Sequence, residues 1–314
     1  MKEIIKVLPN FKKFNDYIEN VKNNINPIML SGLTDSGKVH FAYSTFFYAE
    51  KPICIITYNE LQAKKIIKNL EYFTNDIKFF PKKDIKVYDY LAESKDITYN
   101  RIACLNGIYN KKAKIIVTTI EAVSQKIIPE EVLYKNIINL KVGESINLEE
   151  IKEKLIALGY ERTDVADNKS EFSVRGGIID IAITEKEGIR IELWGDEIDS
   201  IRTFDINTQR SKEKEKEAII FPAHEFVLET DLQKIAEQIE DKRDREEILE
   251  GNYATKIDKY WNIFYTKPNN TFIDYLKDNV DITMKALSES MCSEVISDEK
   301  MMFCKKLPKC HLLP

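Results

Sequence analysis

Short runs of consecutive apolar residues alternate, in the first half of the chain, with stretches whose apolar residues recur every three or four positions. Runs of the first kind are typical of strands buried on both faces of a sheet, and the second spacing is typical of helices. The expected strands are 28–30, 53–56 and 115–117, and the expected helices are 41–50, 61–73 and 101–109. Strands and helices in alternation predict an α/β unit built on a parallel sheet.

The pattern changes near residue 140, where a second unit is predicted. Asn147 can cap a helix over 147–158, since Glu150 stands three residues on and Gly159 can end it. Polar and apolar residues then alternate in stretches that predict an antiparallel sheet. Its expected strands are 172–175, 178–183 and 189–194.

Three further elements are expected after this sheet. Lys and Glu alternate over 211–217, which predicts a solvated loop. A helical pattern covers 230–262, and 271–275 has the composition of a strand.

The strand 189–194 alternates strictly, so its residues divide between two faces. Ile189, Ile191 and Leu193 share one face, and Arg190, Glu192 and Trp194 share the other. Arg and Trp are the residue types that dominate binding interfaces, and the second face is therefore one candidate for docking a partner. In the alternative interpretation, Trp194 covers the end of a strand and the arginines pair with Glu161, Glu171 or Glu192.

A second candidate is the segment GLTDSGKV (32–39), which follows an expected strand and precedes an expected helix, as a phosphate-binding loop does. Gly32, Gly37 and Lys38 match the motif, but Val39 replaces the Ser or Thr whose hydroxyl ligates Mg²⁺. Asp35 adds a carboxylate that repels phosphate. We expect a relic of a nucleotide site, with at most weak ATP or Mg²⁺ binding, no catalytic residues and no cofactor.

Composition narrows the classes of function. A formal net charge of −5 over 314 residues gives no basic excess for nucleic-acid binding, and the lysines of 64–68 leave DNA binding as a weaker interpretation. No apolar run reaches the roughly 18 residues of a membrane span, and the N-terminus lacks the apolar core of a signal peptide. We therefore expect a cytoplasmic protein without a membrane partner. Cys304, Cys310 and His311 lack the CxxC pair of a zinc site, so no metal is expected.

Several segments closely resemble the N-terminal, UvrB-like region of the bacterial transcription-repair coupling factors (Mfd). They are GYER (159–162), EFSVRGGIIDI (171–181), IRIELWGDEIDSIRTFD (189–205), QRS (209–211) and IFPAHEF (220–226). The resemblance implies a RecA-like lobe with a degenerate P-loop and an inserted small α/β domain that binds UvrA. The UvrA-contacting positions of the family fall on Arg175, Arg190 and Trp194.

The same resemblance implies a domain order and a role. Residues 1–137 and 223–281 would form the RecA-like lobe, 138–222 the UvrA-interaction domain, and 282–314 an atypical Cys- and Met-rich tail, expected as a truncated or frame-disrupted end. The implied function is non-catalytic recruitment of UvrA in transcription-coupled nucleotide excision repair. Full-length members are ATP-dependent DNA translocases that displace stalled RNA polymerase, so damaged DNA and RNA polymerase are expected as partners of the full-length family alone.

UvrB shares the module, and a UvrB-like P-loop ATPase that remodels DNA is the main alternative. UvrB-like chains keep a GxTGSGKT loop and insert a long tyrosine-rich hairpin after a segment that 87–90 resembles. Only ten residues separate Tyr90 from Arg101, too few for that hairpin. With Asp35 and Val39 in the loop, this spacing favours the coupling factor.

Overall fold

The computed structural model describes residues 2–25, 28–30, 33–83, 95–228, 231–251, 256–279, 282–286 and 310–313. Contacts divide the chain into two compact units, Met1–Ile127 with Asn269–Pro314, and Ile128–Pro268. The division expected from sequence, at 137/138, 222/223 and 281/282, stays a prediction.

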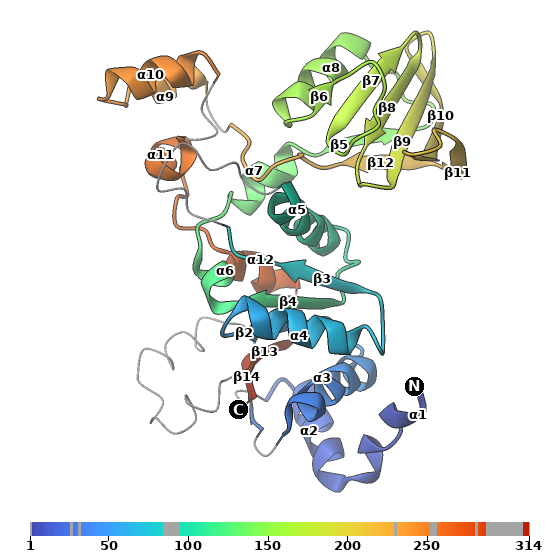
Figure 1. Ribbon diagram of the computed structural model, residues 1–314, viewed down its shortest axis with the longest axis vertical. Helices are drawn as coiled ribbons and strands as arrows, with labels where there is room; N and C mark the ends of the chain where they lie inside the picture. Colours follow the sequence, from blue (N-terminus) through green and yellow to red (C-terminus); the bar gives the residue numbers. More distant parts are fainter. Residues whose placement is uncertain are drawn as a thin grey trace. The chain divides into compact units, whose positions relative to one another are not determined.

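A parallel sheet forms the centre of the first unit (Figure 1). Its described strands lie in the order β1-β14-β13-β2-β4-β3, and all neighbours run parallel. They are β1 (Ile28–Met29), β2 (Ile53–Thr57), β3 (Ile77–Phe80), β4 (Ile115–Thr119), β13 (Ile282–Ala286) and β14 (Cys310–Leu313). Every residue of β2 and β4 is buried, as expected for continuous apolar runs. The predicted α/β class is confirmed.

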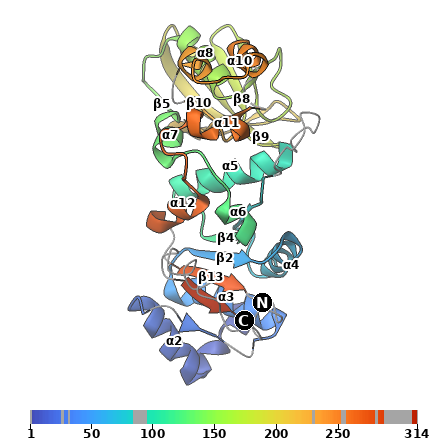
Figure 2. The same ribbon diagram turned by 90° about the vertical axis from the view of Figure 1, so that its left-hand side faces the viewer.

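Helices flank this sheet (Figure 2). Helix α4 packs on β2, β3 and β4, and α5 packs on β3. The apolar face of α4 is formed by Ala63, Ile66 and Leu70, which recur at helical spacing and are buried. The helices of this unit are α1 (Lys2–Ile5), η1 (Leu8–Asn10), α2 (Lys12–Lys22), α3 (Asp35–Ala49), α4 (Glu60–Leu70), α5 (Lys95–Tyr109), α6 (Ile120–Ser124) and α12 (Phe272–Asn279).

Two expectations for this unit need correction. Helix α3 begins at Asp35 rather than at 41, because the Thr34 side chain caps it by accepting a hydrogen bond from the Gly37 amide at 3.2 Å. The strand expected at 271–275 is wrong, since α12 occupies this segment. The Asp274 carboxylate accepts from the Thr271 amide at 2.8 Å, and the apolar residues that suggested a strand are buried along one side of the helix.

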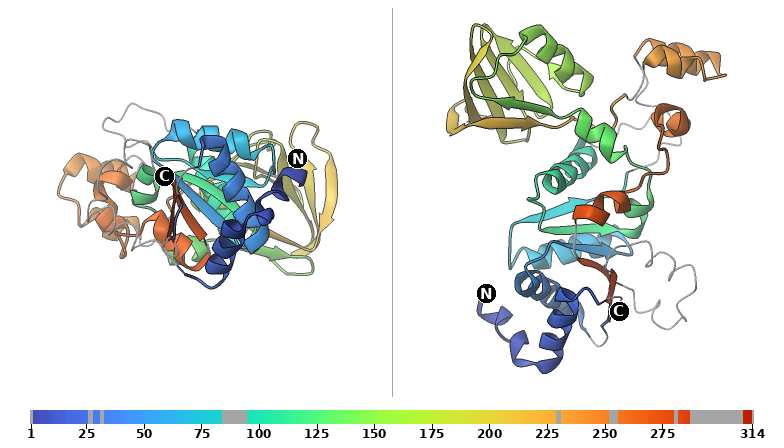
Figure 3. Two further views of the ribbon diagram at one scale, coloured as in Figure 1. Left: turned by 90° about the horizontal axis from the view of Figure 1, so that it is seen from below. Right: turned by 180° about the vertical axis from the view of Figure 1, so that it is seen from behind.

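The second unit contains an antiparallel sheet with α8 (Leu148–Ala157) beside it (Figures 1 and 3). Its described strands lie in the order β11-β10-β9-β8-β7-β6, and each neighbouring pair is antiparallel except β6 and β7. The strands are β6 (Glu161–Arg162), β7 (Glu171–Arg175), β8 (Ile178–Ala182), β9 (Glu187–Trp194), β10 (Glu197–Asp205) and β11 (Ser211–Glu215). The predicted antiparallel sheet and the Asn147 cap of α8 are confirmed.

This unit has further strands and helices, and one of its segments differs from the expectation. β5 (Ile138–Lys141) pairs with β12 (Glu217–Ile220) in a separate antiparallel ribbon, and α7 (Glu130–Lys135) precedes it. Helices α9 (Leu232–Ala236) and α10 (Lys242–Leu249) lie within the expected helical region 230–262, and α11 (Ile257–Phe264) begins inside it and ends two residues beyond. Residues 211–215 are not a loop but the edge strand β11, which hydrogen-bonds to β10 although all its side chains are exposed.

Among the described residues, no helix combines the length and the apolar character needed to cross a bilayer.

Candidate functional site

Two tight turns bring Arg175 and Trp194 to the same end of the antiparallel sheet. Arg175 is paired with Ile178 across the turn between β7 and β8, and Trp194 is paired with Glu197 across the turn between β9 and β10. The Leu193 amide donates to the Gly177 carbonyl at 2.7 Å, so the first turn lies directly beside the end of β9. A Cβ atom on Gly177 would lie 2.9 Å from the Leu193 carbonyl oxygen. Glycine is therefore required at position 177, where the turn approaches the backbone of β9.

Apolar and cationic groups are exposed together at this end of the sheet. The Trp194 residue is 84% exposed and Ile178 is 36% exposed. The Arg175 side chain is 52% exposed. Exposed aromatic and guanidinium groups at one end of a sheet are typical of a protein-binding surface.

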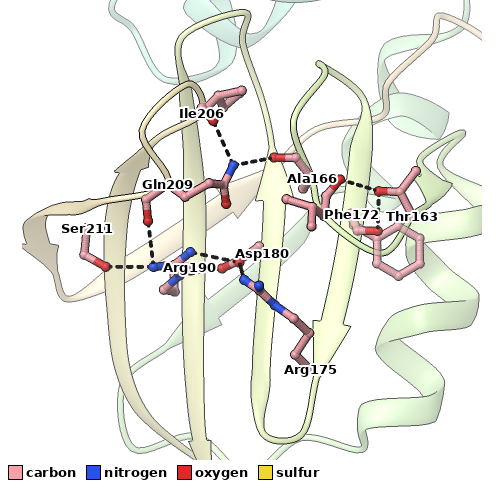
Figure 4. A network of polar contacts seen from close by, with 10 residues as sticks. Thr163, Ala166, Phe172, Arg175, Asp180, Arg190, Ile206, Gln209 and Ser211 are labelled. Atoms are coloured by element: carbon pink, nitrogen blue, oxygen red, sulfur yellow. Dashed lines mark hydrogen bonds and ion pairs between the residues drawn. The ribbon is translucent and has the colours of Figure 1, made fainter.

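Behind these residues, both arginines share one buried carboxylate (Figure 4). Asp180 lies on β8 opposite Arg190 of β9, and its side chain is 1% exposed. Arg190 donates to it twice, from Nε to Oδ1 at 2.6 Å and from Nη2 to Oδ2 at 2.9 Å. Arg175 donates once, from Nη2 to Oδ2 at 2.8 Å. The bidentate geometry is the strong form of an Arg–carboxylate pair.

Arg190 makes further contacts that cover it. Its Nη1 donates to the Gln209 carbonyl and to Ser211 Oγ, both at 3.2 Å, and its guanidinium lies 5.0 Å from the centre of the Phe204 ring. The side chain is only 14% exposed. Its hydrogen bonds to Asp180 raise the pKa of the Arg190 guanidinium above its usual value.

The structure thus brings Arg175, Arg190 and Trp194 onto one sheet, but it exposes them unequally. Arg190 is largely covered, because Asp180, Phe204 and the 209–211 segment surround its guanidinium. Of the acids proposed from sequence as partners of the arginines, Glu192 lies 3.7 Å from Arg202 and adds to the raised pKa of Arg190, but it is not the main partner. Both arginines pair with Asp180, whose signal in the sequence is a single acidic residue inside the apolar run IIDIA (178–182).

The segment that the sequence predicts to be a degenerate phosphate loop carries its own charge pairs. Asp35 Oδ2 accepts from Lys65 Nζ at 2.7 Å, and Asp35 Oδ1 lies 3.7 Å from Lys38 Nζ. The hydrogen bond from Lys65 holds the pKa of the Asp35 carboxyl below its usual value. Val39 is buried in the apolar core.

Gly32 of the phosphate loop lies outside the described residues, as do residues 87–90 that served to weigh the UvrB alternative. Cys304 also lies outside them.

The second unit also has a groove of about 510 Å³ between α8 and β5. Lys135, Lys154, Glu144 and Glu150 are among its lining residues. Within the part of the chain that the structure describes, no group of three or more His, Cys, Asp or Glu side chains could hold a metal ion.

Most of the second unit matches a known interaction domain. Residues 138–226 match the family model of the UvrB interaction domain, so the ribbon of β5 and β12, helix α8 and the whole antiparallel sheet lie inside the match. The chain therefore carries a UvrB interaction domain.

Over most of its length the chain is similar to transcription-repair-coupling factors. It is 29% identical over 301 residues to that of Bacillus subtilis (strain 168), which covers 88% of this chain and 26% of the relative. It is 33% identical over 202 residues to that of Staphylococcus aureus (strain USA300), and this match covers 64% of this chain and 17% of the relative. It is 32% identical over 227 residues to that of Staphylococcus haemolyticus (strain JCSC1435), and this match covers 72% of this chain and 19% of the relative. The chain spans about a quarter or less of these curated relatives, and the resemblance to coupling factors is confirmed.

Proposed function

We propose that the second unit docks UvrA and that the chain recruits this protein in transcription-coupled nucleotide excision repair. The observation that carries the proposal is that Trp194 is exposed and Arg175 half-exposed at the same end of a sheet that matches a UvrB interaction domain. An exposed indole stabilises a complex when a partner covers it, and a guanidinium adds a directional contact to an acidic or carbonyl group.

A titration of UvrA into the chain tests this proposal. Replacing Trp194 by Ala or Arg175 by Glu should each weaken binding by about 2 kcal/mol or more, which is about 30-fold in Kd. Two matched controls should bind normally. Lys186→Glu changes an exposed charge in the turn between β8 and β9, at the opposite end of the same sheet, and Tyr72→Ala removes an exposed aromatic ring of the first unit. Unchanged UvrA affinity in both test variants would contradict the proposal.

We also propose that the chain performs no ATP chemistry of its own. Lys38 would bind phosphate in a working loop, but here it is nearly buried and faces the Asp35 carboxylate. Val39 has no side-chain oxygen for Mg²⁺ and is packed in the core. In the full-length family, translocation on DNA and contact with RNA polymerase would then depend on regions beyond those that this chain matches.

The alternative proposal is a UvrB-like ATPase. A measurement of ATP hydrolysis distinguishes it from a chain that performs no ATP chemistry. We expect no Mg²⁺-dependent ATP hydrolysis above that of a Lys38→Met variant, which keeps the length of the side chain but not its charge. Hydrolysis that requires Mg²⁺ and is lost in the variant would establish the ATPase instead.

A further inference from the structure

Strand β5 pairs along only one of its two edges within the described residues. Its partner is β12, and the Val142 amide extends the same register by donating to the Lys216 carbonyl at 3.1 Å. In an antiparallel pair, hydrogen-bonded and non-hydrogen-bonded positions alternate. Every second residue of β5, counted from Val142, therefore bonds to β12, and the N–H and C=O groups of Asn139 and Lys141 point away from it.

These outward-pointing backbone groups are only partly used. The Lys141 amide donates to Glu144 Oε2, and the Lys141 carbonyl accepts from the Glu144 amide, both at 3.1 Å. The N–H and C=O groups of Asn139 have no hydrogen-bond partner among the described residues. Unpaired groups on a strand edge are a template for a further strand. The edge of β5 thus offers one open position, at Asn139.

The groove of about 510 Å³ borders this edge, and α8 forms its other side. Its buried apolar lining includes Ile138, Leu140, Ile151 and Leu158. The volume falls within the range of about 300–1,000 Å³ that is usual for ligand pockets. An extended segment that pairs with Asn139 would place its neighbouring side chains on the face of Ile138 and Leu140, against this apolar lining.

Helix α8 runs in the opposite direction to β5. Residues 142–147 connect the end of β5 to the start of α8. The Ala223 amide, three residues after the end of β12, donates to the Leu158 carbonyl at 2.8 Å. Because the end of β12 lies opposite the start of β5, the end of α8 lies near the start of β5.

The two ends of the groove therefore carry opposite charges. Lys135, which precedes β5, and Lys154, in the second half of α8, line one end, whereas Glu144 and Glu150 line the other. Among the described residues, none of Lys135, Lys154 and Glu150 has an ion-pair partner. Charges arranged in this way favour a ligand with complementary charges at its two ends.

We propose that this groove binds an extended peptide segment of a partner protein, which adds as an antiparallel strand to the free edge of β5. Main-chain hydrogen bonds to Asn139 hold such a segment, and alternate side chains give specificity. In the antiparallel direction, its basic residue comes first, near Glu144 and Glu150, and its acidic residue comes last, near Lys135 and Lys154. The proposal is independent of UvrA docking, because neither Arg175 nor Trp194 lines the groove.

Two peptides of identical composition test the proposal by fluorescence anisotropy with the 314-residue chain. The first is fluorescein-Gly-Ser-Arg-Val-Thr-Val-Glu-amide, and the second exchanges its Arg and Glu. We expect the first to bind at least about fivefold more tightly, because only its charges complement both ends of the groove. Glu150→Lys together with Lys154→Glu should reverse this preference.

A proline substitution tests the strand pairing itself. Asn139→Pro removes the open N–H without removing a hydrogen bond to β12, a position where sheets tolerate proline. We expect it to weaken binding of the first peptide by about tenfold. Glu217→Pro makes the same backbone change on the outer edge of β12 and should leave the affinity within about twofold. Far-ultraviolet circular dichroism establishes which variants are folded, and if Asn139→Pro does not fold, the charge reversal decides.

The contrary outcomes are distinct. No binding of either peptide at about 1 mM chain would overturn the proposal. Equal binding of both peptides, unchanged by the charge reversal, would overturn the charge matching and with it the proposed occupant. Binding of the first peptide that a folded Asn139→Pro variant retains in full would show that no strand is added to β5, and would overturn the proposal as well.

Discussion

Gly159 ends helix α8 with a φ of 87° and leaves room for the ring of His224. A methyl group at position 159 would overlap with that ring. His224 stacks on Phe226 with ring centres 3.9 Å apart, and the neighbouring Tyr160 hydroxyl donates to the Phe221 carbonyl at 2.9 Å. At the scale of single residues, these contacts join the end of α8 to the segment that follows β12.

Gly159→Ala should destabilise the protein for two reasons. The left-handed backbone costs a residue with a Cβ about 1–2 kcal/mol, and displacing the His224 ring adds about 1–3 kcal/mol of overpacking. Gly143→Ala is the matched control, since Gly143 has a φ of 86° and nothing within 4 Å of the added Cβ. Urea unfolding of both variants measures the difference, and equal losses would show that the His224 contact contributes nothing.

His224 should make stability depend on pH. Burial lowers the pKa of its imidazole from 6.5 to about 4, so the folded protein resists the protonation that the unfolded chain accepts. The stabilising effect is complete above pH 6.5 and is lost as pH falls from 6.5 towards 4, up to about 3 kcal/mol. Unfolding free energies measured between pH 7 and 4.5 should fall less steeply in His224→Asn. Parallel curves would contradict this assignment.

At the scale of elements, β11 shows what sequence patterns miss. Its Lys and Glu residues have no apolar side to bury, and the strand exists because β10 offers an unpaired edge. Charged side chains on an edge strand also prevent further strands from adding to the sheet. The same charge pattern that predicted a loop is therefore compatible with a protected sheet edge.

Removing this protection should cause self-association. Lys212→Val together with Lys214→Val makes the edge apolar, and we expect larger species that increase with concentration in sedimentation velocity. Lys64→Val with Lys68→Val, on the exposed side of helix α4, is the control and should stay unchanged. A double β11 variant that sediments like the parent would show that another feature blocks the edge.

Other elements show where sequence reasoning succeeds. The buried strands β2 and β4 were predictable because continuous apolar runs fit only a position covered on both faces. Alternation in β9 predicted its two faces, and the register confirms that Ile191 faces the same side as Ile179 while Arg190 faces the side of Asp180. The pairing of the arginines with Asp180 was not predictable, because it depends on cross-strand register.

At the scale of the whole molecule, the chain consists of two compact units, and the second contains the candidate surface. Its sheet has its own buried core, including Phe172, Ile179, Ile181, Ile191 and Ile201. A unit that buries its own apolar side chains is expected to fold without the rest of the chain.

Residues 128–268 expressed alone should therefore unfold cooperatively and keep the UvrA affinity of the longer chain within about threefold, since the three proposed docking residues lie inside them. Thermal unfolding followed by circular dichroism, together with a UvrA titration, measures both properties. A fragment that ends at residue 196, and so lacks β10 and β11, serves as the control that should not fold. If the 128–268 fragment is folded but does not bind, the first unit takes part in docking.

Hydrogen–deuterium exchange of the 314-residue chain with and without UvrA tests the central claim most directly. We predict slower exchange on complex formation at the turn amides of 176–177 and 195–196, and no change at 35–39. Protection confined to the first unit, or absent from both turns while UvrA is bound, would contradict the account.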